Sequence, residues 1–146
     1  MERILVGVEL RETSLGPVIH AINLAKRIRA KVHVLLVDGA ERPHGQGQPR
    51  QQARALRRQA VEGLIDQARR EGLPVDYYIS DGPLENETVK LIQENAISLL
   101  VVGLPASGGE AALKEFHKTL ENIRLRVDCH IEVVQERDQS ITTERE

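Results

Sequence analysis

Short apolar runs and helical stretches alternate along the whole of this chain. Each run is rich in Val, Ile or Leu, and the segments between runs hold apolar residues at helical spacing. Because parallel strands need long crossover connections, usually helices, this order predicts a single-domain open parallel α/β sheet with helices on both faces. The predicted strands are Ile4–Val8, Val32–Val37, Val75–Ser80, Leu99–Val102 and Ile131–Val134. The predicted helices are 17–28, 51–71, Leu84–Asn95 and Glu110–Arg126.

Apolar stripes predict which side of two of these helices faces the sheet. In the helix over 51–71 the stripe is Ala53, Leu56, Ala60, Leu64 and Ala68. In the helix over 110–126 it is Leu113, Phe116, Leu120 and Ile123. The Gly-, Pro-, Gln- and His-rich stretch 39–49 is predicted to be a mobile loop. Residues 136–146 are polar without periodicity, so we expect one domain over 1–135 and a frayed tail after it.

Composition narrows the possible partners of the chain. Aromatic residues make up 2% of its 146 residues and Trp is absent, which argues against stacking of nucleic-acid bases. The net charge is -2, so no overall field favours nucleic acid or an anionic membrane. No apolar run approaches the roughly 20 residues that span a bilayer. The single Cys129 fits a reducing cytoplasm, and the first residues lead directly into a strand without the apolar block of a signal peptide.

The segment Leu99–Gly109 reads as a buried strand that stops at a glycine and continues in small residues. A glycine lets the backbone turn sharply, and small side chains let N–H groups approach an anion. In doubly wound sheets ligands bind beyond the carboxyl ends of the strands, where the winding direction reverses. The segment therefore predicts a nucleotide site at this end of the sheet.

The order and spacing of these features resemble the universal stress protein family, in its UspA-like group, over Met1–Gln135. The resemblance implies a five-stranded sheet in the order 3-2-1-4-5, of the Rossmann-like, adenine nucleotide alpha hydrolase-like kind. It also implies a cytoplasmic homodimer. The residues that carry it are Ile4–Val8, Ser14 at the start of the first helix, Leu24–Arg27, His33–Val37, Gly82 with Pro83, Leu99–Gly103, Glu121 and Cys129.

Some members of that family bind ATP through Gly-x-x-Gly, nine residues and Gly-Ser/Thr after the fourth strand. Here Gly103 takes the first position and Ala106 the second, with Ser107 and Gly108 following in the same loop. The last pair falls on Phe116 and His117 or, counted back from Glu121 and Cys129, on His117 and Lys118. Neither count supplies the glycine or the hydroxyl. Each lost hydrogen bond to a charged group costs about 1.5–3 kcal/mol, so two losses weaken binding by roughly two to four orders of magnitude.

The residues that the resemblance implies for the nucleoside match the family better than those implied for the phosphates. Glu9, next to Val8, stands where the family has an aspartate that faces the nucleoside, and it is one methylene longer. Val37 and Val102 keep the apolar contacts implied for adenine. The candidate ligand is therefore ATP or AMP with Mg²⁺, and the altered motif predicts that it binds weakly or not at all. One alternative is that His117 or Lys118 supplies positive charge to a phosphate in place of the lost donors. The other is that both side chains are solvated on the face of the helix.

We expect a non-enzymatic regulatory or stress-response module that pairs with itself and with an unidentified protein partner. The resemblance implies dimerisation through the last strand, where Ile131, Val133 and Val134 form an apolar edge and Glu132 suits an exposed side. The alternative is a nucleotide-dependent switch that binds ATP and hydrolyses it slowly. A nucleotidyl transferase is disfavoured because no His-x-x-His follows the first strand.

Other polar residues have simpler interpretations. The basic residues Arg50, Arg54, Arg57 and Arg58 could contact an acidic partner or polyanion, but a solvated face balanced by Glu62 and Asp66 is the preferred interpretation. The histidines lack metal-ligand spacing, and His33 is expected to be a satisfied core or edge residue. Cys129 and His130 are adjacent in sequence, so on a strand their side chains point to opposite faces and form no nucleophilic pair.

Overall fold

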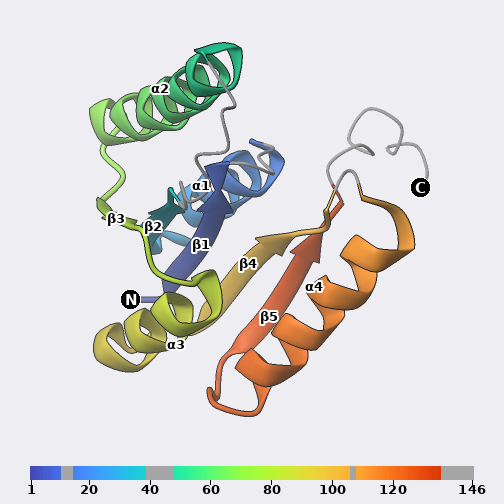
Figure 1. Cartoon of the computed structure of the whole chain (residues 1–146). Helices are drawn as coiled ribbons and strands as arrows, with labels where there is room; N and C mark the ends of the chain where they lie inside the picture. Colours follow the sequence, from blue (N-terminus) through green and yellow to red (C-terminus); the bar gives the residue numbers. More distant parts are fainter. Residues whose placement is uncertain (11–14, 39–47, 106–107, 136–146) are drawn as a thin grey trace, which may run out of the picture.

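The computed structural model describes residues 1–10, 15–38, 48–105 and 108–135. It contains one parallel sheet in the order β3-β2-β1-β4-β5, which confirms the predicted fold class (Figure 1). The strands are β1 (Arg3–Glu9), β2 (Lys31–Val37), β3 (Val75–Ser80), β4 (Leu99–Gly103) and β5 (His130–Val134). The helices are α1 (Gly16–Ile28), α2 (Gln48–Arg70), α3 (Leu84–Asn95) and α4 (Gly109–Arg124).

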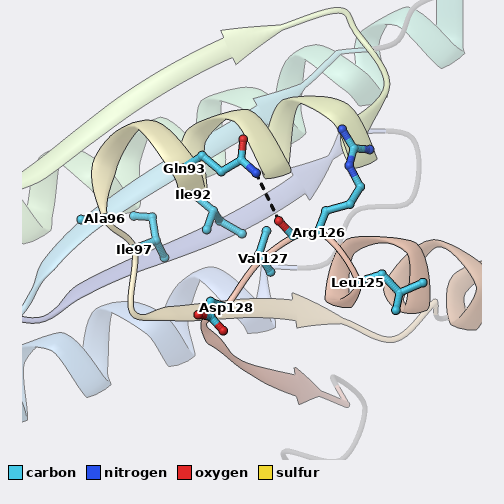
Figure 2. A pocket seen from close by; sticks show the side chains of 8 residues that line it. All are labelled: Ile92, Gln93, Ala96, Ile97, Leu125, Arg126, Val127 and Asp128. Atoms are coloured by element: carbon cyan, nitrogen blue, oxygen red, sulfur yellow. Dashed lines mark hydrogen bonds between the residues drawn. The ribbon is translucent and has the colours of Figure 1, made fainter.

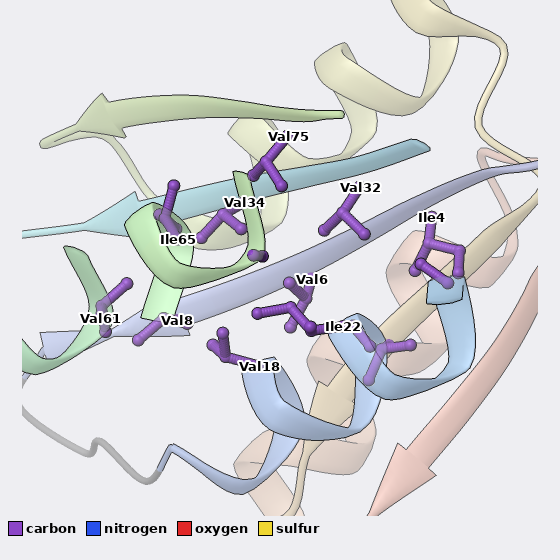
Figure 3. Packing of buried hydrophobic residues seen from close by; sticks show 14 of the residues in the cluster. Ile4, Val6, Val8, Val18, Ile22, Val32, Val34, Val61, Ile65 and Val75 are labelled. Carbon is purple, nitrogen blue, oxygen red and sulfur yellow. The ribbon is translucent and has the colours of Figure 1, made fainter. Parts of the chain in front are cut away.

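Two helices cover each face of the sheet, because successive side chains of a strand point to opposite faces. On one face Ile4, Val6 and Val8 of β1 pack with α1 and α2 (Figure 3). On the other face Leu5 of β1 packs with α3 and α4. The inner strands β1 and β2 are therefore buried on both sides, as their nearly continuous apolar sequences predict.

The predicted element boundaries differ from the structure mainly around α2. Strand Val75–Ser80 and helix Leu84–Asn95 are confirmed as predicted. Helix α2 begins at Gln48, so Gln48 and Pro49 belong to a helix and not to the predicted loop. A proline is tolerated in the first turn, where its missing N–H has no helical partner to lose. The rest of that loop, and the predicted tail, lie outside the described residues.

The predicted inner face of α2 is confirmed at Leu64 and Ala68 and wrong at Leu56. Leu56 is 64% exposed, whereas Val61, Ile65 and Ala68 are buried against the sheet (Figure 3). The sequence carries two overlapping apolar stripes displaced by one residue, and spacing alone does not choose between them. The stripe that contains the β-branched Val61 and Ile65 fills the layer over β1 and β2.

The predicted inner face of α4 is confirmed only in its second half. Leu120 and Ile123 are buried, Phe116 is half-buried, and Leu113 is 38% exposed. Helix α4 begins beyond the carboxyl end of β4 and runs back along the sheet, so its first turns have little sheet to cover. Among the described residues, no helix combines the length and the hydropathy needed to cross a membrane.

Candidate functional site at the carboxyl ends of the strands

The strand order places the winding reversal between β1 and β4. From β1 the chain proceeds to β2 on one side, and from β4 it proceeds to β5 on the other. At the carboxyl ends Glu9 of β1 pairs with Val37 of β2, and Val102 and Gly103 end β4 on the opposite side of β1. The structure thus brings these predicted site residues to one edge of the sheet, the edge where doubly wound folds bind ligands.

The three valines assigned to the nucleoside are part of the hydrophobic core. Val8, Val37 and Val102 are 4%, 3% and 8% exposed. Val8 packs with α1 and α2, whereas Val37 and Val102 pack on the α3 and α4 side. Their side chains do not form one surface, so an adenine ring at this edge would meet the strand ends more than the faces of the valines. Glu9 itself is half-buried.

Gly103 has a packing reason to be glycine. A Cβ built on it would lie 2.6 Å from Cγ of Pro17, in the first turn of α1. That distance is far below an ordinary contact of 3.4–4 Å, so the start of α1 packs directly on the backbone that ends β4. The glycine at this position is therefore explained by packing against Pro17, without a ligand.

Two consecutive glycines begin α4. Gly108 has φ 95° at the helix N-cap and Gly109 has φ 60°, a left-handed conformation that favours glycine. A Cβ on Gly108 would also lie 2.6 Å from Cβ of Ala112. Glu110 follows in the first turn and complements the positive end of the helix dipole. A carboxylate at this position opposes a phosphate there. The other loop candidates, Ala106 and Ser107, lie outside the described residues.

His117 and Lys118 lie within α4, and both are exposed. At 1.5 Å per residue His117 is about 12 Å along the helix from Gly109. The ring of His117 contacts the ring of Phe116 edge to face, with centroids 5.6 Å apart. Phe116 in turn packs on the α3 and α4 side of the core. The second half of the family motif thus falls within α4, as the apolar periodicity of 110–126 already indicated.

The basic residues of α2 reach the same edge of the sheet, which the sequence interpretation missed. Arg54 forms an ion pair with Asp38, the residue after β2. Arg57 Nη1 donates to the carbonyl oxygen of Leu10, after β1, at 2.8 Å. For these two arginines the preferred interpretation as a solvated, locally balanced face is wrong. Both contacts join segments that are far apart in sequence, so helical spacing does not predict them. The side chain of Arg50 lies outside the described part of the chain.

Arg58 behaves as the sequence predicts. Its Nε donates to Oε2 of Glu62 at 3.1 Å, and the hydroxyl of Tyr77 on β3 donates to the same oxygen at 2.7 Å. The hydrogen bond from Tyr77, and a smaller one from Arg58, lower the pKa of the Glu62 carboxyl. Burial, and then the hydrogen bond to Glu62, raise the pKa of Tyr77. This contact ties α2 to β3 away from the strand ends.

His33 is a core residue with one ring nitrogen satisfied. It is fully buried, and its Nδ1 lies 3.2 Å from the hydroxyl of Tyr78. Within the described residues its Nε2 is buried without a hydrogen-bond partner. Burial lowers the pKa of His33 more than neighbouring Asp76 raises it, so the neutral form is favoured. The expectation of a fully satisfied histidine is therefore only half confirmed.

Two further titratable groups, Cys129 and His130, stand at the start of β5. Cys129 is half-buried, and that burial raises its thiol pKa, which opposes thiolate chemistry. His130 beside it is exposed. Across residues 1–10, 15–38, 48–105 and 108–135, no three His, Cys, Asp or Glu side chains gather as metal ligands would.

Strand β5 lies at the edge of the sheet, with β4 on one side. Val133 is 41% exposed, while Ile131 and Val134 are half-buried against the two sides of the core. Glu132 is also half-buried, with Oε2 3.2 Å from Nε2 of His20 on α1. The edge is thus partly apolar and carries the contact between His20 and Glu132 on its α1 side.

A groove of about 490 Å³ lies at the opposite end of the sheet. It separates the end of α3 from the segment before β5, and Gln93 Nε2 donates across it to the carbonyl of Arg126 at 3.1 Å (Figure 2). Ile92, Ile97 and Val127 form its apolar floor. None of the residues predicted to bind a ligand lines this groove.

Comparison with known proteins agrees with this architecture. The sequence model of the universal stress protein family matches residues 1–135. No match to a curated protein was found.

Solved structures of universal stress proteins superpose along almost the whole chain. One in complex with cAMP has 20% identity and a TM-score of 0.64, and covers 92% of this chain and 96% of its own. UspA from Lactobacillus plantarum has 18% identity and a TM-score of 0.62, and covers 91% and 97%. A protein from Archaeoglobus fulgidus in complex with dAMP has 13% identity and a TM-score of 0.57, and covers 91% and 97%. At these identities the likeness establishes the fold alone.

Proposed function

The chain belongs to the universal stress protein family, and from that premise we propose that it is a non-enzymatic regulatory module with weak adenine-nucleotide binding. The observation that carries the proposal is the chemistry of residues 116–118 in α4. The family's ATP motif has a glycine followed by Ser or Thr at this place, whereas this chain has Phe116 and the exposed His117 and Lys118. A nucleoside end without a full phosphate loop favours a small adenylate over ATP.

The nucleoside end of the proposed site is the edge formed by Glu9, Val37, Val102 and Gly103. Two structural relatives were solved with adenine mononucleotides, cAMP and dAMP, which supports an adenylate as the ligand class. Glu9 offers a carboxylate to ribose hydroxyls, and the strand ends offer backbone groups to the base. Mg²⁺ would accompany ATP but is not needed for a monophosphate.

We propose that the module acts as a cytoplasmic homodimer formed through β5. Exposed Val133 and half-buried Ile131 and Val134 supply apolar contacts. Among the described residues β5 has a neighbouring strand on one side alone, so its other edge can pair with a second copy. The dimer would then act by binding a further protein. Sedimentation of the full chain against Val133→Glu tests this part, because a charge at the centre of the interface should shift the population toward monomer.

Ligand titration tests the nucleotide part. We expect AMP to bind with a dissociation constant of roughly 0.1–1 mM, and ATP with Mg²⁺ to bind no more tightly. A ligand present at 100 times its dissociation constant stabilises the fold by about 2.7 kcal/mol, which a melting curve detects readily. Binding of ATP with Mg²⁺ below about 10 μM would contradict the proposal and favour the ATP-dependent switch. GMP serves as the control for base selectivity.

A further inference from the structure

We propose that Arg54 and Arg57 of α2 form an anion-binding pair that recognises the phosphate monoester of a ligand at the carboxyl ends of β1 and β2. The inference rests on the proposed nucleotide function for the identity of the whole ligand, but not for the anion itself. The family motif places phosphate recognition after β4. In this chain the structure supplies cations from the other side of β1.

The hydrogen bond of Arg57 and the ion pair of Arg54 fix the positions of the two guanidinium groups. Arg57 Nη1 bonds the carbonyl of Leu10 at 2.8 Å, and Arg54 pairs with Asp38. Leu10 and Asp38 are the residues that directly follow β1 and β2, and the last residues of those strands are paired with each other. The guanidinium groups therefore stand over neighbouring strand ends, beside the predicted nucleoside position.

The donor count of Arg57 leaves capacity for a phosphate. A guanidinium has five N–H donors, and the contact with Leu10 uses one of them. A backbone carbonyl is a neutral acceptor, so this contact does not neutralise the positive charge. Arg54 is three residues away, on the same side of the helix, and its side chain is 20% exposed. The two arginines thus present forked donors from one side of α2, and such donors match the oxygens of a phosphate monoester.

Other cations are less suited to the same role. Arg58 is held by the Glu62 carboxylate, which also accepts the Tyr77 hydroxyl. His117 and Lys118 are exposed on α4, two or more turns from its start, and Glu110 in the first turn opposes an anion there. Arg57 thus combines a fixed position at the ligand edge with a charge that its carbonyl partner leaves in place.

Asp38 acts as an internal competitor for the anion. Its carboxylate pairs with Arg54 and is 32% exposed in its side chain, so an incoming phosphate would share or replace this partner. Replacement of Asp38 by asparagine keeps the shape and removes the competing charge. The anion-binding pair therefore predicts a gain of affinity in Asp38→Asn, whereas an ion pair that only fastens α2 predicts no gain.

Calorimetric titration of the full chain with AMP, adenosine and inorganic phosphate tests the pair. We expect AMP to bind about 10-fold more tightly than adenosine, the value of one charge-assisted hydrogen bond. In Arg57→Gln that preference should disappear, while Arg58→Gln, the matched control on the same helix, should keep it. Asp38→Asn should bind AMP several-fold more tightly. If Arg57→Gln does not fold, Arg57→Lys, which keeps a donor for Leu10, should weaken AMP binding without affecting adenosine.

The outcomes separate this inference from the proposed function. Equal affinity for AMP and adenosine in the wild type, or an unchanged preference in the Arg57 variant, would overturn the anion pair and leave the nucleoside site standing. Phosphate binding that depends on Arg57, without any binding of adenosine or AMP, would support the pair and overturn the nucleotide function. Absence of binding by all three ligands would overturn both.

Discussion

Replacement of Gly103 by alanine tests why β4 ends in glycine. The new methyl group would lie 2.6 Å from Cγ and 3.5 Å from Cδ of Pro17, so α1 and β4 must separate by about 1 Å to restore an ordinary contact. Overpacking of this size costs about 1–3 kcal/mol. At 2–4 °C per kcal/mol for a domain of this length, we expect the melting temperature to fall by roughly 4–8 °C for a 2 kcal/mol loss.

A double-mutant cycle assigns that cost to Pro17. Pro17→Ala removes Cγ and Cδ and leaves Cβ, which is 3.8 Å from the position of the new methyl group. Gly103→Ala should therefore cost about 0.5 kcal/mol or less in the Pro17→Ala background. Urea unfolding monitored by circular dichroism gives the four free energies. An equal cost in both backgrounds, or a negligible cost in the wild type, would refute the packing explanation.

Gly63→Ala on α2 is the matched control for a glycine replacement. Nothing lies within 4 Å of a Cβ at this position, and the residue is inside a helix. We expect a gain of about 0.5–1 kcal/mol, because alanine loses less conformational freedom than glycine. The opposite signs at positions 63 and 103 distinguish a steric cost from a general effect of the substitution.

Three further predictions concern burial. Because the folded pKa of His33 lies below 6.5, the unfolding free energy should hold above pH 6.5 and fall below it as the unfolded chain takes up the proton first; urea unfolding at several pH values should show less of this fall in His33→Gln. Ile65→Ala should cost about 2–5 kcal/mol and Leu56→Ala under about 0.5 kcal/mol in the same assay, and the reverse ranking would contradict the assigned face of α2. Cys129 should react with a thiol reagent more slowly in the folded chain than in urea, and equal rates would contradict its burial.

Local pattern was enough to predict the sheet and its helices. The β-branched runs and the helical spacing between them specify a parallel α/β arrangement, and the spacing of 110–126 already indicated that His117 and Lys118 lie on a helix. The burial of Val61 and Ile65 on α2 was not predictable, because Leu64 and Ile65 extend two equally apolar stripes. The contacts of Arg54 and Arg57 were not predictable from the sequence either, because each joins segments that only the folded chain brings together.

The central position of β1 in the sheet determines which strands a bound ligand would stabilise. β1 is hydrogen-bonded to both β2 and β4, so it is the one strand that joins the two halves of the sheet. Its amides should exchange with deuterium last, and those of the edge strands β3 and β5 first. A ligand at the proposed site beside Glu9 would contact the strand that is shared by both halves. We therefore expect AMP to slow this exchange in β2 and β4 as well as in β1, and deuterium exchange with and without AMP would measure the change.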